Sequence, residues 1–313
     1  MKRYMKQPTG KLWVDTFFAR KTAHKYPKQD LTGKTVIFTG GMGRLAVERF
    51  AQMGADICLI GRSLQKTMDI INEMQLTGYK GKFHAIQCDL GDLTQVRGAA
   101  GDVSQRYGKI DFLINCAGVN LATRSLSPDG YEVNFSVNYL APFLLTELLL
   151  DRIKATPNGR ILHLASATQE VAKLHLDDLN LEQNPWSMLA SYAQAKLCVI
   201  IHGHDLAERL EGSDVTINSL NPGYIRSNLT RHVKGFERVF TSLFGRLAAP
   251  TWVGAERIVA AALDPRYQAA SGAYIYEDML LSPNPIALDG EKRAQLMQIS
   301  REMTQLDVKG CQG

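Results

Sequence analysis

The sequence contains no apolar run of about 18 residues, so it predicts no helix that spans a membrane. It has five cysteines, an odd number, and they include no CxxC pair and no spacing typical of a zinc site. Four of these cysteines lie in apolar runs, where a buried thiol packs as a small hydrophobic side chain. This pattern indicates a reducing compartment. We therefore expect a cytoplasmic protein without a bound metal.

Charged residues make up only 21% of the 313 residues, and the net charge is +5. The basic residues are scattered and no aromatic–basic platform accompanies them, so we do not expect nucleic-acid binding. Residues 1–30 are basic and contain a few aromatic side chains, but they lack the apolar stretch of a signal peptide. We expect them to form an N-terminal extension on the surface of a single domain, residues 31–313.

Apolar runs alternate with segments of helical periodicity along most of the chain. Strands are expected at residues 36–38, 57–60, 83–87, 112–116, 161–165, 215–220 and 273–276. Helices are expected at residues 44–53, 63–75, 93–107, 131–153 and 186–210. Strands that are apolar throughout and separated by helices predict a parallel sheet that is covered on both faces. The fold class is therefore α/β, a Rossmann-type doubly wound parallel sheet of about seven strands with helices on both faces.

A glycine cluster follows the first expected strand and precedes the first expected helix. Its residues are Gly40, Gly41, Met42 and Gly43. Glycines at this position let the main chain approach a pyrophosphate, which then lies at the positive end of the helix. Many tight turns are rich in glycine, so the cluster gains its meaning from its place between strand and helix. It predicts a dinucleotide-binding site.

The end of the second expected strand predicts which dinucleotide is preferred. In this fold a carboxylate there binds the 2′-hydroxyl of NAD, whereas an arginine accommodates the 2′-phosphate of NADP. Here Gly61 is followed by Arg62, and no carboxylate is present. We predict NADP(H) as the preferred cofactor, with Arg62 as its main determinant, Arg44 as a helper and NAD(H) as the second option. The simpler interpretation is that Arg62 is a solvated loop residue.

Further short motifs follow the expected strands in order. They are Thr39-Gly40 with the adjoining Gly41-Met42-Gly43, Cys88-Asp89-Leu90, Asn115-Cys116-Ala117-Gly118, Ser166, Tyr192-Ala193-Gln194-Ala195-Lys196 and Asn221-Pro222-Gly223. With these motifs the chain resembles the short-chain dehydrogenase/reductase superfamily from about residue 31 to residue 279. Within that superfamily it is most similar to the branch of retinol dehydrogenases and protochlorophyllide-reductase-like enzymes. The resemblance implies an NAD(P)-dependent oxidoreductase that acts on CH–OH donors.

The resemblance also assigns cofactor contacts. It places Asp89 against the adenine, and Asn115 with Gly118 in a turn beside the nucleotide. It places a second set of residues against the nicotinamide amide and the phosphates: Pro222, Gly223 and Ser227. Tyr192 and Lys196 of the catalytic helix complete the cofactor-binding set.

The glycine loop departs from the family pattern. The family carries three variable residues between its Thr-Gly and Gly-x-Gly elements, whereas here Gly40 is followed directly by Gly41. A loop that is three residues short is unable to follow the usual path over the adenosine phosphate. The alternative to an active enzyme is therefore a catalytically impaired nucleotide-binding or scaffold protein.

Tyr192 and Lys196 are four residues apart, which places them on one face of the expected helix. A free phenol has a pKa of about 10, and a neighbouring cation favours the phenolate. The pair is therefore suited to proton transfer near neutral pH. Ser166 lies just past the fifth strand, at the edge where open sheets bind ligands, and Ser191 is a weaker rival for its role. His163, inside that strand, is interpreted as a core histidine.

The resemblance implies a mechanism in which hydride passes between nicotinamide C4 and a carbonyl carbon. Tyr192 gives or takes the proton of the oxygen, and Ser166 hydrogen-bonds that oxygen. Lys196 holds the nicotinamide ribose and lowers the pKa of the tyrosine. Asn138 holds a water on the proton relay. The simpler interpretation of Asn138 is a solvent-facing side chain.

Substrate contacts are expected from loops at the same edge of the sheet. The candidates are Val119, Ala167, Tyr224 and the segment 228–250. That segment has the pattern of an amphipathic helix with a cationic face. We interpret it as a lid, with packing inside its own domain as the simpler interpretation. An apolar lid and the family branch predict a hydrophobic alcohol and its ketone or aldehyde as substrates.

The expected partners follow from the same observations. The resemblance implies that subunits pair through the two long helices, which predicts a homodimer or homotetramer. Weak contact of the cationic face with an anionic membrane surface is a minor alternative. In that case the cytoplasmic protein would be peripheral to a membrane.

Overall fold

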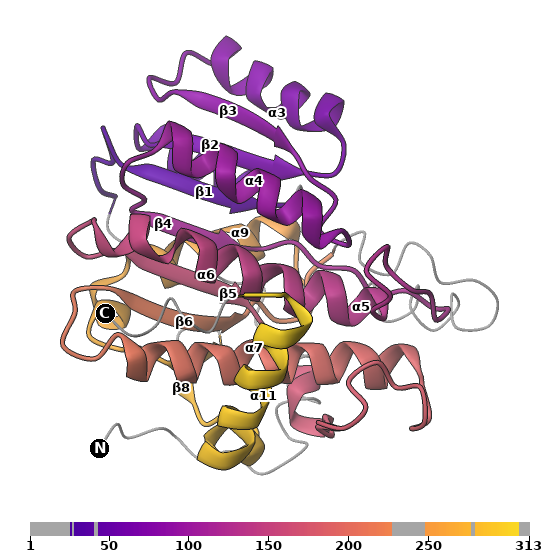
Figure 1. The fold of residues 1–313 in the computed structure, drawn as a ribbon. Helices are drawn as coiled ribbons and strands as arrows, with labels where there is room; N and C mark the ends of the chain where they lie inside the picture. The colour runs from indigo at the N-terminus through magenta and orange to yellow at the C-terminus, as the bar shows by residue number, and fades with distance from the viewer. Residues whose placement is uncertain (1–25, 27, 41–42, 227–247, 277–278, 307–313) are drawn as a thin grey trace.

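The apolar runs of the sequence form one sheet that lies between two layers of helices (Figure 1). The computed structural model describes residues 26, 28–40, 43–226, 248–276 and 279–306. The strand order is β3-β2-β1-β4-β5-β6-β7-β8. The strands are β1 Thr35–Thr39, β2 Asp56–Gly61, β3 Phe83–Gln87, β4 Phe112–Asn115, β5 Arg160–Leu164, β6 Thr216–Asn221, β7 Ala273–Tyr276 and β8 Met279–Leu281.

The first seven strands pair in parallel, so the predicted doubly wound sheet is confirmed. Every residue of β1, β4, β5, β6 and β7 is buried, as expected for strands with helices on both faces. The eighth strand is the difference from the prediction. β8 has only three residues and pairs antiparallel with β7, and a run that short gives no periodicity to detect.

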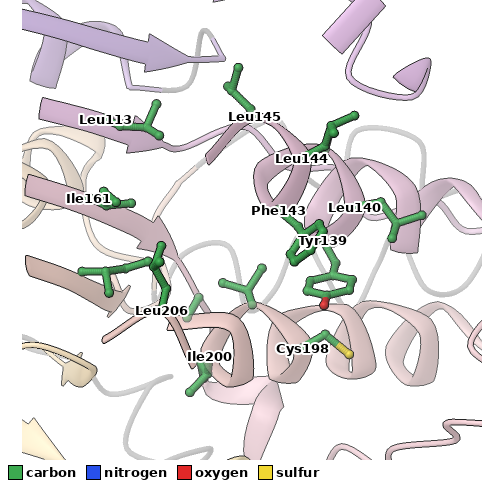
Figure 2. Close-up of a cluster of buried hydrophobic side chains, with 14 of the residues drawn as sticks. Leu113, Tyr139, Leu140, Phe143, Leu144, Leu145, Ile161, Cys198, Ile200 and Leu206 are labelled. Atoms are coloured by element: carbon green, nitrogen blue, oxygen red, sulfur yellow. The ribbon is translucent and has the colours of Figure 1, made fainter. Parts of the chain in front are cut away.

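One face of the sheet is covered by α4 (Leu93–Arg106), α6 (Ala141–Lys154) and α7 (Met188–Arg209). Side chains of these helices and of the strands beneath them form the larger apolar core. Figure 2 shows part of it, in which Leu113 comes from β4 and Ile200 from α7. Because α7 lies in this layer, its catalytic candidates are held on a helix that is anchored along its length.

The opposite face is covered by α2 (Arg44–Gln52), α3 (Leu64–Leu76) and α9 (Thr251–Leu263), which enclose the second apolar core. Ser63 caps α3, since its Oγ accepts from Lys66 N at 3.4 Å.

The long helix predicted over residues 131–153 is present, but it is not a regular α-helix. A π turn, η1 (Ser136–Leu140), separates the short α5 (Val133–Phe135) from α6. Turns of this kind are rare inside α-helices and are frequent at functional sites. Among the described residues, Val133–Lys154 is the one helix long and apolar enough to cross a membrane. However, 72% of its apolar window is buried inside the protein, as in the core helix of a globular domain.

The C-terminal helix α11 (Gly290–Met303) was not expected from the sequence. It is capped by Asp289, whose carboxylate accepts from Glu291 N and Lys292 N at 3.1 Å. Its apolar face is narrow, because Leu296 and Met297 are its only buried apolar residues, with Ile299 and Met303 packed against the core at its edge. A helix with so small an apolar stripe gives a weak periodic signal.

Candidate active site

The carboxyl ends of the parallel strands bring the two glycine-containing motifs together. Thr39 ends β1 and lies in register with Asn115, which ends β4. The Thr39 hydroxyl accepts hydrogen bonds from Cys116 N at 3.1 Å and Ala117 N at 3.2 Å. The glycine turn and the Asn115–Gly118 turn are therefore joined, as a shared nucleotide site requires.

At two positions of the first turn, neighbouring atoms leave no room for a side chain, so only glycine fits. Gly40 has a φ of +84°, and a Cβ there would lie 2.8 Å from Ala117 Cα. A Cβ on Gly43 would lie 2.2 Å from the Phe38 ring. Gly43 also begins α2 without a side-chain cap, which leaves the amides of the first turn without a side-chain acceptor. Gly41 and Met42, also predicted to bind cofactor, lie outside the described residues.

The residues predicted to select the cofactor follow β2 and β3. Arg62 is exposed and comes directly after Gly61, the last residue of β2. Its carbonyl accepts from Gln87 Nε2 at 3.4 Å. Asp89 is partly exposed and its carboxylate accepts from Gly91 N at 2.9 Å. The helper Arg44 is already engaged, because its guanidinium pairs with Glu48 and Glu73.

Asn115 begins a chain of buried polar groups that the sequence did not predict. Asn115 Nδ2 lies 3.2 Å from His163 Nδ1, and His163 Nε2 lies 3.2 Å from His202 Nδ1. His202 Nε2 in turn lies 3.2 Å from Glu147 Oε1, which Arg209 also binds. Burial, together with the His202 and Lys196 charges, holds the pKa of His163 well below its usual value. His163 is thus a neutral, fully buried core histidine, as the sequence indicated.

Ser166, Tyr192 and Lys196 meet at the carboxyl end of β5. Ser166 precedes the 3-10 helix η2 (Ala167–Val171), and its hydroxyl accepts from Thr168 N at 3.3 Å. Tyr192 and Lys196 lie one turn apart on α7, with the Lys196 Nζ 5.6 Å from the centre of the Tyr192 ring. Lys196 Nζ donates to the carbonyl of Leu164 at 2.7 Å, which fixes the ammonium beside the end of the strand.

The two ionisable groups have perturbed acidities because both are buried. Burial raises the pKa of Tyr192 to about 12, and a hydrogen bond with the Ser166 hydroxyl lowers it in part. Burial lowers the pKa of Lys196 to about 8, and the neighbouring Cys116 raises it in part. Burial therefore sets the direction of the tyrosine shift, and the lowering of this pKa by Lys196 stays a prediction. At neutral pH the phenol is protonated.

The rival serine is engaged elsewhere. Ser191 Oγ accepts from Asn134 Nδ2 at 2.8 Å, and Asn134 Oδ1 accepts from Leu121 N at 2.8 Å. Ser191 therefore holds the loop after β4 rather than facing the phenol of the neighbouring Tyr192. This geometry favours Ser166 for the role beside the tyrosine.

Asn138 lies in the π turn and is buried, so the solvent-facing interpretation is wrong. Its Nδ2 donates to the carbonyls of Val119 at 2.8 Å and Asn134 at 2.7 Å, and its Oδ1 accepts from Val119 N at 3.3 Å. A Cβ on Gly118 would lie 2.8 Å from Asn138 Oδ1 and 3.8 Å from Lys196 Nζ. Gly118 thus keeps open the space between the asparagine and the lysine.

The remaining predicted residues surround the same edge. Pro222, Gly223 and Tyr224 follow β6 and are partly exposed. Gly223 has a φ of +77°, and its amide donates to Asn221 Oδ1 at 3.0 Å. Ala167 is buried in the first turn of η2. Ser227 lies outside the described residues.

The predicted lid lies almost wholly outside the described residues, which resume at residue 248. Its two ends meet, because Arg226 N donates to Ala249 O at 2.9 Å and Ala249 N donates to Tyr224 O at 2.8 Å. The described residues on either side of the segment are therefore joined beside the end of β6. In the described part of the chain no group of His, Cys, Asp or Glu side chains could hold a metal ion.

Comparisons with known sequences agree with this geometry. A sequence model of the short chain dehydrogenase family matches residues 34–237. The chain is 32% identical over 289 residues to retinol dehydrogenase 13 of Homo sapiens, which covers 90% of this chain and 87% of the relative. It is 30% identical over 285 residues to polyprenol dehydrogenase of Homo sapiens, with 89% and 86% covered.

Solved structures share the fold. An uncharacterised protein from Mycobacterium paratuberculosis superposes with a TM-score of 0.72 at 24% identity, over 88% of this chain and 95% of that chain. A short chain dehydrogenase from Burkholderia cenocepacia in complex with NADP superposes with a TM-score of 0.63 at 22% identity, over 80% and 98%. At these identities the superpositions support the arrangement of sheet and helices and do not assign a substrate.

Proposed function

The chain belongs to the short-chain dehydrogenase family, and on that premise we propose that it transfers hydride between NADP(H) and a hydrophobic alcohol or its ketone or aldehyde. The observation that carries the proposal is the meeting of Ser166, Tyr192 and Lys196 at one sheet edge. That edge also holds the glycine turn and the Asn115–Gly118 turn. The named relatives are dehydrogenases, so they give no support to the alternative of an impaired nucleotide-binding or scaffold protein.

The residues at this edge fit a dinucleotide. A side chain at Gly40 would clash with the neighbouring Ala117 turn, and one at Gly118 would clash with Asn138. The first turn of α2 has backbone amides that no side chain caps, as at a phosphate-binding helix N-terminus. Gly40, Gly41, Met42 and Gly43 would hold the pyrophosphate. Asp89 would contact the adenine, and Asn115 with Gly118 would form the turn beside the nucleotide. The nicotinamide amide and the phosphates would be contacted by Pro222, Gly223 and Ser227. When bound, the dinucleotide supplies or accepts the hydride.

The protein's own groups handle the proton. Tyr192 is protonated at neutral pH, so it donates its phenolic proton to the carbonyl oxygen in reduction and accepts it back in oxidation. Ser166 Oγ, already hydrogen-bonded to the phenol, stabilises the charge that develops on that oxygen. Lys196 holds the nicotinamide ribose. Asn138 fixes the Val119 loop, and in the proposal it also supports the water of the proton relay.

The preference for NADP(H) over NAD(H) rests on Arg62. Its guanidinium is exposed just past β2, and no carboxylate occupies the adjoining positions. Arg44 is a weaker helper than the sequence suggested, because two carboxylates already neutralise it. The short glycine turn reduces the number of amides around the phosphates, so the cation at position 62 gains importance.

The proposed substrate class is a large apolar alcohol. Two relatives are named for retinol and polyprenol, which are both long hydrocarbon alcohols. Val119, Ala167 and Tyr224 lie on the three loops at the carboxyl edge of the sheet and are the proposed contacts. The segment 228–250 is proposed as the lid, since its two ends close at Tyr224 and Ala249 beside these loops.

Assembly and location complete the proposal. Helix α11 lies against α7, so pairing through the long helices as a homodimer or homotetramer would use the parts of α6 and α7 that α11 leaves uncovered (Figure 1). The protein is proposed to be cytoplasmic. A weak contact with a membrane surface would run through the cationic face of the lid.

The test is NADPH-dependent reduction of a long apolar aldehyde, with Tyr192→Phe beside the wild type. Removal of the phenolic proton should lower kcat at least about a hundredfold while NADPH still binds. Tyr107→Phe is the matched control, because it removes a hydroxyl that hydrogen-bonds His84 Nδ1, far from the site, and it should keep full activity. A Tyr192→Phe variant as active as the control would refute the assignment.

A further inference from the structure

We propose that Tyr274 is a positioning residue for the reaction, which holds the main chain at Ser166 and so aligns the serine hydroxyl with Tyr192. The proposal rests on the proposed function and adds a residue that no motif of the sequence marked. Tyr274 lies on β7, two strands from β5, the strand that Ser166 follows, and its side chain is fully buried. It acts through Ser166 and does not itself reach the reacting atoms.

The first link is a direct hydrogen bond. The Tyr274 hydroxyl donates to the main-chain carbonyl of Ser166 at 3.3 Å. Ser166 is extended, with φ −156° and ψ 156°, and caps η2. A five-residue 3-10 helix has poor internal hydrogen-bond geometry, so its position depends on contacts from outside. The phenol supplies such a contact at the residue whose orientation matters most.

The second link consists of two side-chain amides beside the phenol oxygen. Those of Gln169 and Asn221 both act on the Tyr274 hydroxyl and favour its ionised form, although burial keeps the phenol protonated. Each amide oxygen is already used, because Gln169 Oε1 accepts from Asn284 N at 2.7 Å and Asn221 Oδ1 accepts from Gly223 N at 3.0 Å. Both amide nitrogens are buried, and neither makes a hydrogen bond of normal geometry within the described residues.

Tyr274 therefore lies where three segments of the proposed site come together. Its hydroxyl donates to the Ser166 carbonyl after β5, and the side-chain amides of Gln169 in η2 and Asn221 at the end of β6 lower its pKa in part. Phenylalanine at this position would keep the ring and its packing. It would remove the side-chain donor of the Ser166 carbonyl and leave that carbonyl with the weaker bond from Gln169 N at 3.3 Å, at a cost in free energy.

The first test is the Tyr274→Phe variant in steady-state kinetics with NADPH and an apolar aldehyde. We expect kcat to fall about tenfold, with KM for both substrates unchanged, because orientation is lost and binding is not. In a Ser166→Ala background the same substitution should cause no further loss, since the residue it aligns is gone. Tyr107→Phe, which also loses a hydrogen-bonded hydroxyl, should match the wild type.

The second test measures hydrogen exchange of the amides of residues 166–172, which requires no turnover. In Tyr274→Phe these amides should exchange faster than in the wild type or in Tyr107→Phe. Unchanged exchange together with unchanged kcat would overturn the proposal, and so would an equal tenfold loss in the Ser166→Ala background. If the wild type reduces no aldehyde, the proposed function fails, while the exchange comparison still decides whether Tyr274 orders the Ser166 turn.

Discussion

Lys196 is the residue at which burial has the clearest functional consequence. Its ammonium donates to the Leu164 carbonyl, and burial lowers its pKa to about 8. Below that pH the group is charged, and above it the group is neutral. Tyr192 has the opposite shift, because burial raises its pKa to about 12 and keeps it protonated across the same range. The first group to titrate above neutral pH is therefore the lysine and not the tyrosine.

This difference predicts the pH dependence of reduction. The kcat/KM of the wild type should decline as the pH rises through about 8, since kcat/KM reports groups of the free enzyme. In Lys196→Arg the cation stays charged, so the smaller residual activity should lose this inflection. A pH series from 6 to 10, both enzymes measured side by side, decides it. An inflection near 8 that persists in the arginine variant would contradict the assignment to Lys196.

At the scale of elements, the glycine turn between β1 and α2 is the proposed site of the cofactor's pyrophosphate. Gly40 and Gly212 share nearly the same backbone conformation, with φ of +84° and +83°. Their surroundings differ, because a Cβ at Gly40 would lie 2.8 Å from Ala117 Cα, whereas Gly212 has no heavy atom within 4 Å. Alanine substitutions at Gly40 and Gly212 therefore distinguish two costs. Both variants bear the backbone strain of a positive φ, and only the Gly40 variant displaces the adjoining Ala117 turn.

Alanine at either glycine should lower the free energy of unfolding by about 1 kcal/mol through the positive φ. Gly40→Ala should cost more than that and should also weaken NADPH binding, since it pushes the Ala117 turn away. Denaturant unfolding and calorimetric binding measure the two effects. Equal stability losses with unchanged affinity in both variants would show that the contact with Ala117 is unimportant.

The elements also show what the sequence could predict. The strands and most helices were predictable because apolar residues recur regularly along every element that faces a core. Spacing and position also predicted that Ser166, Tyr192 and Lys196 share one sheet edge, where the structure places them, and their catalytic roles stay predictions. The π turn at Asn138 was not, because all five residues of Ser136–Leu140 are buried and leave no alternation from which the helix type could be read. The role proposed for Tyr274 was not predicted either. In the sequence, a tyrosine in a buried strand is indistinguishable from other core aromatic residues, and only the structure gives the hydrogen-bond partner of its hydroxyl.

At the scale of the whole molecule, α11 ties the C-terminus to the catalytic layer. The Tyr139 hydroxyl lies 2.5 Å from Ser300 Oγ, and the Tyr131 hydroxyl donates to Met303 O at 2.9 Å. Leu296 is fully buried in the core that α4, α6 and α7 form. In Figure 1, α11 crosses this layer close to α7. The helix that carries Tyr192 and Lys196 is thus packed between the sheet and the C-terminal segment.

Leu296→Ala should therefore lower the free energy of unfolding by about 2–5 kcal/mol, because it opens a cavity in this core. The matched substitution Leu76→Ala removes an equal side chain that is 88% exposed, and its effect should stay within about 0.5 kcal/mol. Urea unfolding of the two variants and the wild type measures both changes in the free energy of unfolding. Equal, small losses in both would mean that α11 does not stabilise the domain.

Calorimetric titration of the intact protein with NADPH and with NADH tests the central claim most directly. The wild type should bind NADPH about tenfold more tightly than NADH, because the Arg62 guanidinium meets the 2′-phosphate. Arg62→Ala should remove this difference, while Lys82→Ala, which changes an exposed cation before β3, should preserve it. No heat with either nucleotide from the folded wild type would contradict the account and favour a scaffold with an impaired glycine turn.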